Sequence, residues 1–203
     1  FKVQNSGATA TDAGVKLTDG GMTGVTGCTI TNNEITTFNG LGIIGGSANS
    51  LTLNNIHNNA AYGALLIGTS GNTIESNTIS NTGLDGIALD NASAVGGPLS
   101  IGSTGNFIKS NTISNGGRDG IFIGENCSGN YITDGNVLNT IASIGINVWR
   151  PSGQTITDNS ITNALTGIRL LGSSNNTITG NTLTTNGTGI IIDPSWQSGV
   201  WYS

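Results

Sequence analysis

Residues 72–79 read Asn72-Thr-Ile-Glu-Ser-Asn77-Thr-Ile, a phrase with an apolar residue, two spacers, Asn, one spacer and a second apolar residue. The phrase returns about every 22 residues, and self-similarity at such a period is typical of a solenoid in which each repeat is one coil. The copy at 132–138 is stretched by one residue. The first apolar residues of the copies, called anchors below, are Ile30, Leu51, Ile74, Ile108, Ile132, Ile156 and Ile178.

A second phrase, Gly followed by alternating apolar residues, comes 11 to 13 residues after each anchor, as in Gly86-Ile87-Ala88-Leu89. The period-2 alternation predicts three short strands per coil: one leads into the Asn, one leaves it, and the third begins at the Gly. Eight copies of the third strand predict seven to eight coils within one domain, residues 1–203. The start at Phe1, without Met, predicts a fragment or processed part of a longer chain.

The N-T-I-x-x-N-x-I and G-I-x-L phrases resemble those of right-handed parallel β-helix proteins of the pectin-lyase-like superfamily, especially the NosD-like short-repeat branch. The resemblance covers about residues 12–193. It implies an all-β fold, a single-stranded right-handed parallel β-helix. It implies no single activity, because the group includes lyases, hydrolases, epimerases, phage tailspikes and surface proteins.

The repeated Asn predicts a structural ladder at the bend between the first and second strands. An Asn side chain can satisfy backbone groups at a bend and can bond to its equivalents in neighbouring coils. The ladder is predicted to contain Asn33, Asn54, Asn77, Asn111, Asn159 and Asn181. A second polar column, two residues before the anchors, is predicted to contain Cys28, Asn49, Asn72, Asn106, Asn130, Gln154 and Asn176.

One repeat is longer than the others, because Ile74 and Ile108 are 34 residues apart whereas other anchors are 21 to 24 apart. The additional residues fall in 91–104, which is loop-like and predicts an inserted loop after a third strand. Loops on a rigid scaffold often carry function, and a harmless excursion explains this one equally well.

Composition excludes several classes of function. The net charge is −5 and the six basic residues are dispersed, so no basic stripe for nucleic acid is expected. No apolar run approaches the ~20 residues of a membrane span, so no membrane insertion is expected. One His and two distant Cys cannot supply a zinc site, and Cys28 and Cys127 are expected to be free thiols. The Asn-, Thr- and Gly-rich composition favours an extracellular or cell-surface location.

The third-strand face is the candidate contact surface, because substrate lies along that face in the enzymes that this chain resembles. Alternation predicts Gly at each outward position before the middle one. The face is then sparse and mostly apolar. The predicted middle outward residues are Lys16, Ile44, Leu65, Ala88, Phe122, Asn147, Arg169 and Ile191.

Acidic residues gather at one place on this face. Asp85 and Asp119 precede the Gly of adjacent coils, so their carboxylates are predicted to lie ~5 Å apart, with Arg118 beside them. Asp90 and Glu125 follow the same two strands. Turn capping is the favoured interpretation. The alternatives are a Ca²⁺ or sugar site at Asp85 and Asp119, and catalysis by these acids with Arg118.

Aromatic residues give a further signal. Phe122 and Trp149 are predicted to project from successive coils, near Asn147 and Arg169. Flat rings beside amide and guanidinium groups suit sugar binding, and they also suit packing against a neighbouring subunit or domain. The candidate ligand-binding residues are therefore Phe122, Asn147, Trp149, Arg169, Asp90 and Glu125.

Together these patterns favour an extracellular structural or carbohydrate-contacting β-helix module of a surface, fibre or tailspike-like protein. Its expected partners are polysaccharides or neighbouring subunits and domains, and no cofactor is expected beyond the optional Ca²⁺. The alternative is a polysaccharide-active enzyme, a lyase, epimerase or hydrolase, with its site on the third-strand face.

Overall fold

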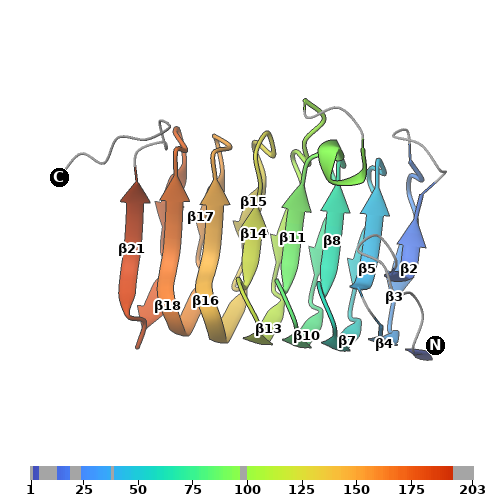
Figure 1. Cartoon of the computed structure of the whole chain (residues 1–203), viewed down its shortest axis with the longest axis horizontal. Helices are drawn as coiled ribbons and strands as arrows, with labels where there is room; N and C mark the ends of the chain where they lie inside the picture. The colour runs from blue at the N-terminus through green and yellow to red at the C-terminus, as the bar shows by residue number, and fades with distance from the viewer. Residues whose placement is uncertain (1, 5–12, 19–23, 38, 97–99, 194–203) are drawn as a thin grey trace.

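The chain winds into a parallel β-helix whose coils lie side by side along the long axis (Figure 1). The computed structural model describes residues 2–4, 13–18, 24–37, 39–96 and 100–193. Seven coils carry all three strands, and two strands of a partial coil, β1 (Lys2–Gln4) and β2 (Ala13–Leu17), precede them. Within the described residues every strand pairing is parallel, as the predicted right-handed parallel β-helix requires, and that fold is confirmed.

The first strands of the seven coils form one sheet. All seven anchors are paired in register along it, from Ile30 with Leu51 to Ile156 with Ile178. The five inner anchors are fully buried, and the two end anchors pack against the same core. The strands of this sheet are β3 (Thr29–Thr31), β6 (Ser50–Thr52), β9 (Thr73–Glu75), β12 (Phe107–Lys109), β15 (Tyr131–Thr133), β17 (Thr155–Thr157) and β19 (Thr177–Thr179).

The second and third strands are separate in five of the seven coils. In coils 5 and 6 they run together as the long strands β16 (Val137–Trp149) and β18 (Ser160–Leu171), which differs from the predicted three short strands. A register shift between Ile141 and Ile144 lets this pairing continue around the corner. The other second strands are β4 (Glu34–Thr36), β7 (Asn55–Asn59), β10 (Thr78–Thr82), β13 (Thr112–Gly116) and β20 (Thr182–Thr184), and the other third strands are β5 (Asn39–Ile44), β8 (Ala64–Ile67), β11 (Ile87–Asp90), β14 (Ile121–Ile123) and β21 (Thr188–Asp193).

Gly63, Gly86 and Gly145, which precede third strands, point into the molecule, so the prediction that this Gly faces outward is wrong at these positions. A Cβ added to Gly86 would lie 2.4 Å from Cγ2 of Ile113 and 2.7 Å from the carbonyl oxygen of Gly120. The same clash with a buried second-strand Ile occurs at Gly63 and Gly145. The chain turns the corner here, which breaks the alternation and brings the backbone against the core. Only Gly fits so close an approach.

The predicted Asn ladder is confirmed. Each member donates a side-chain N–H to Oδ1 of the next, as from Asn54 to Asn77 and from Asn77 to Asn111 at 3.0 Å each. The same Oδ1 atoms accept the backbone N–H of the preceding coil's Asn. The second polar column is also continuous, from the backbone of Cys28 to Asn176.

Asn136 is an additional member of the first ladder, although its repeat is one residue longer. Its Oδ1 accepts from Asn111, and its amide donates to Asn159 at 2.9 Å. The extra residue is absorbed by Asp134 and Gly135, which both have left-handed φ, of 55° and 80°. A tight turn therefore keeps Asn136 in line.

Residues of the inserted segment that the structure describes pack back on coil 2. A short 3₁₀ helix, η1 (Ala92–Val95), lies beside β8, and Ala92 donates its backbone N–H to Ile101. An added Cβ at Gly68 would be 3.1 Å from Ile101 and 3.5 Å from Ala92. Residues 97–99 lie outside the described part.

Replacing Ile108 by Asp is expected to unfold the domain. The substitution places an unpaired charge in the centre of the anchor column, at a cost of several kcal/mol. Circular dichroism and thermal melting measure the effect. Thr133→Asp, at an outward position of the neighbouring coil, serves as the control and should keep the fold; equal stability of the two variants would contradict the buried column.

Replacing Asn77 by Ala is expected to lower stability by about 1–3 kcal/mol, since buried backbone and amide groups of the two neighbouring coils lose their partners. In a domain of this size each kcal/mol corresponds to roughly 2–4 °C of melting temperature. The control is Asn55→Ala, at an exposed strand position. An unchanged melting temperature for Asn77→Ala would show that the ladder is not structural.

Candidate functional site

The third-strand face is built from columns of residues paired coil to coil. The middle outward column runs through Lys16, Gly42, Leu65, Ala88, Phe122, Asn147, Arg169 and Ile191. Ile44, predicted in this column, instead belongs to the next one, with Ile67 and Asp90. The reason is the register of β5, which starts at Asn39. In that register Gly42 pairs with Leu65, and Ile44 pairs with Ile67 two residues farther along.

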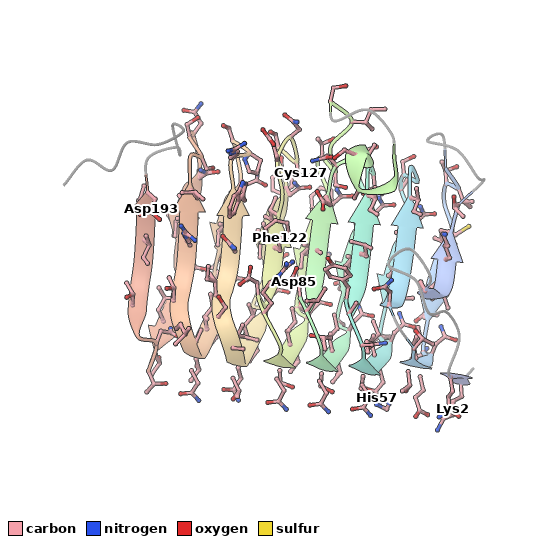
Figure 2. The ribbon with its side chains drawn as sticks, in the orientation of Figure 1. Lys2, His57, Asp85, Phe122, Cys127 and Asp193 are labelled. Atoms are coloured by element: carbon pink, nitrogen blue, oxygen red, sulfur yellow. The ribbon has the colours of Figure 1, made fainter. Side chains whose placement is uncertain are left out.

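The apolar side chains of coils 1–3 on this face are buried rather than exposed. Ile44, Leu65, Ile67 and Ala88 form a small cluster outside the main core, each at most 9% exposed. Phe122 is partly buried against the cluster. The exposed part of the face therefore begins at coil 4. Phe122 lies where the buried and exposed parts of the face meet, and Figure 2 shows it close to Asp85, near the middle of the molecule.

Asp85 and Asp119 are held in the corner before the third strand. Asp85 is 0% exposed and Asp119 is 3% exposed. Oδ1 of Asp85 accepts the backbone N–H of Asp119 at 3.0 Å, and Oδ1 of Asp119 accepts the backbone N–H of Ile144 at 3.1 Å. Each carboxylate thus caps the turn of the following coil, in the same way as the Asn ladder does.

Arg118 neutralises Asp85. Its Nε donates to Oδ1 of Asp85 at 2.8 Å, and its Nη2 donates to Oδ2, which makes the pair bidentate. The guanidinium also lies over the ring of Phe122, 5.4 Å from the centroid. Because the ion pair and the ring both fix it, Arg118 joins coils 3 and 4 as a rigid clamp.

Asn147 holds the other carboxylate. Its Nδ2 donates to Oδ2 of Asp119 at 2.8 Å, and the residue is only 6% exposed. Its Oδ1 is buried without a hydrogen-bond partner in the described structure. The site therefore contains one unmet hydrogen-bond acceptor beside Phe122 and Arg169, its register partners.

Burial raises the pKa of the Asp85 carboxyl, while the hydrogen bonds from Arg118 and from the Asp119 backbone oppose that shift. The hydrogen bond to Asp85 raises the pKa of Arg118, so the guanidinium stays charged. Burial also raises the pKa of Asp90, against a hydrogen bond from the Asn91 backbone.

The remaining predicted residues lie farther along the face. Trp149 is 40% exposed at the end of the third strand of coil 5. Glu125 pairs with Arg150 at 3.4 Å. The structure thus brings Asp85, Asp119, Arg118, Phe122 and Asn147 into one cluster, and leaves Asp90, Glu125, Trp149 and Arg169 around it.

The acid pair does not fit a Ca²⁺ ion. Oδ2 of Asp85 faces the guanidinium of Arg118, and Oδ2 of Asp119 accepts from Asn147. No group of three or more His, Cys, Asp or Glu within the described ranges is placed to hold a metal. Cys127 is equally unsuited, since burial raises the pKa of its thiol to about 12, and both cysteines are free, as predicted.

Tyr62 is a member of the cluster that the sequence patterns did not indicate. Burial raises the pKa of its hydroxyl, and the nearby guanidinium of Arg118 opposes that shift. Tyr62 precedes Gly63, as Asp85 precedes Gly86, and its backbone N–H bonds to Oδ1 of Asn39. The available signal was therefore the position directly before the repeated Gly.

The two buried carboxylates are poorly placed for acid–base chemistry on a bound ligand. General acids and bases must reach a proton of the substrate. Here both carboxylates lie below the surface with their oxygens bonded to the protein, whereas Trp149 and the outer edge of Arg118 face outward.

The chain matches the family described as "Right handed beta helix region" over residues 1–150 and 98–200. No curated protein matches it. No helix within the described ranges has the length and apolar character needed to cross a membrane.

Three solved structures share the fold. The Streptococcus pneumoniae surface protein and adhesin PfbA is 15% identical, with a TM-score of 0.61 over 83% of this chain and 49% of that one. The A-module of the Azotobacter vinelandii mannuronan C-5 epimerase AlgE4 is 13% identical, with a TM-score of 0.57 over 81% and 55%. The alginate lyase from Paenibacillus sp. str. FPU-7 is 17% identical, with a TM-score of 0.58 over 92% and 79%. The chain thus spans about half the length of the first two.

The double variant Asp85→Asn, Asp119→Asn is expected to lose stability rather than surface function. The new amide N–H groups would face the donors Arg118 and Asn147, and leaving such buried groups unpaired costs about 1–3 kcal/mol. Thermal melting measures the loss. The control is Glu125→Gln, which removes an exposed ion pair and should change little. A double variant as stable as the parent would contradict turn capping.

Proposed function

Because the chain belongs to the right-handed β-helix family, we propose that it is an extracellular structural or carbohydrate-contacting module of a surface, fibre or tailspike-like protein. Solved structures that share this fold include a surface adhesin, a mannuronan epimerase and an alginate lyase. Its partners are accordingly polysaccharides or neighbouring subunits and domains.

One observation carries this proposal: the rigid, outward surface over coils 4–6 is formed by groups that bind sugars. Trp149 offers an indole that is 40% exposed, and Arg118 is clamped in place by Asp85 and Phe122. Flat rings take up the apolar faces of sugar rings, and neighbouring polar groups bond their hydroxyls. A surface fixed before binding loses little entropy when a ligand arrives.

A polysaccharide lyase, epimerase or hydrolase is the second candidate, favoured by the presence of Asp85, Asp119 and Arg118 in one cluster. A lyase or epimerase needs a base that reaches the sugar, and a hydrolase needs two accessible carboxylates. The engagement of both carboxylates in turn capping argues for binding without turnover.

Replacing Trp149 by Ala is expected to weaken glycan binding at least about tenfold, the loss of a stacked ring. A glycan array followed by isothermal titration with the bound oligosaccharide measures it. The matched control is Tyr131→Ala, which removes an aromatic ring of the same exposure from the first-strand face. Equal loss in both variants, or none in either, would contradict the assignment of the surface.

Turnover is tested on the same glycans by absorbance at 235 nm, for lyase products, and by reducing-end release. We expect none. Turnover that disappears in the Asp85→Asn, Asp119→Asn variant at a temperature where that variant is folded would establish the enzymatic alternative.

A further inference from the structure

The charges around the third strands of coils 3–7 favour one class of glycan over another. Five carboxylates surround this surface, and three guanidinium groups accompany them, so negative charge is in excess by two. The carboxylates belong to Asp85, Asp90, Asp119, Glu125 and Asp193, and the guanidinium groups belong to Arg118, Arg150 and Arg169.

Each of the three guanidinium charges is already compensated. Arg118 is bidentate on Asp85, and Nη1 of Arg150 lies 3.4 Å from Glu125. Arg169 directs Nε and Nη2 at Oδ2 of Asp193, both at 3.1 Å. A carboxylate on a ligand could bind only the remaining N–H groups of these guanidinium groups, and would meet the like charge of a protein carboxylate a few ångströms away.

The surface offers both kinds of hydrogen-bonding group. Ionised carboxylates such as Asp193 and Glu125 can only accept hydrogen bonds, and the partly exposed guanidinium groups can only donate them. A sugar hydroxyl both donates and accepts, so it can bond to either group, whereas a uronate carboxylate can only accept.

We propose that the third-strand face of coils 4–7 binds neutral, hydroxyl-rich glycans and rejects polyuronates, an inference that rests on the carbohydrate-contacting function proposed above. A neutral chain stacks a sugar ring on Trp149 and donates its hydroxyls to the acceptors around it. Neutral glycans are favoured over polyuronates because the arginines of this face are already paired with protein carboxylates.

The test compares neutral hexasaccharides (cellohexaose, xylohexaose and mannohexaose) with hexamannuronate and hexagalacturonate. Isothermal titration is run on the whole chain at low ionic strength, where screening of charges is weakest. We expect at least one neutral hexamer to bind and both uronates to bind at least about tenfold more weakly.

A gain-of-function variant tests the cause. Asp193→Asn releases Arg169 from its carboxylate, and a charge-assisted hydrogen bond to a uronate should raise hexauronate affinity about tenfold or more. The matched control is Asp158→Asn, which removes one negative charge at an exposed turn between the first and second strands. Asp158→Asn should leave the binding of the neutral hexamer unchanged.

The outcomes separate the two proposals. Uronate binding by the unaltered protein as tight as neutral binding overturns this inference and leaves carbohydrate contact intact. Binding of neither class overturns both. An equal effect of Asp193→Asn and Asp158→Asn on hexauronate affinity shows that the Arg169 pair is not the cause of rejection, and so overturns the inference as well.

Discussion

In-register stacking of identical coils is the constraint on which the rest of this structure depends. Parallel strands hydrogen-bond from one coil to the next, so every residue lies directly over its equivalents. Apolar equivalents then merge into one continuous core, and amides become ladders in which each member satisfies the next coil's backbone. A chain with few charges and modest hydrophobicity can therefore be stable without a large core.

Stacking has an electrostatic consequence that the cluster at coils 3 and 4 resolves. A column also places like charges over one another, and Asp85 and Asp119 occupy equivalent corners. Each carboxylate is compensated by a different donor. Arg118 of coil 4 bonds to Asp85 of coil 3, and Asn147 of coil 5 bonds to Asp119 of coil 4. The same groups cannot also be free acids, which is why a cluster that suggests catalysis in sequence is part of the framework in three dimensions.

The sequence predicted the features that depend on the length of the repeat. It missed those that depend on the turn between the second and third strands. The anchor column and both amide columns depend only on repeat length, and they lie where the phrases place them. The inward Gly86 and the exchange of Ile44 for Gly42 depend on how the chain turns between second and third strands, where strict alternation fails. Tyr62 was missed because the position before the repeated Gly carries Asp in the two coils that suggested the site, and because its interaction with Arg118 crosses coils.

The framework also determines where recognition can occur. A β-helix repeats its structural residues, so a ligand can be specified only by residues that depart from the repeat. On the third-strand face the departures include Phe122, Asn147, Trp149 and three arginines, and neighbouring coils hold Asn147 and the arginines in place. Each arginine is paired with a protein carboxylate before any ligand arrives. An anionic partner would meet that carboxylate's charge, whereas a neutral sugar can stack on an aromatic ring and bond through its hydroxyls to donors and acceptors alike.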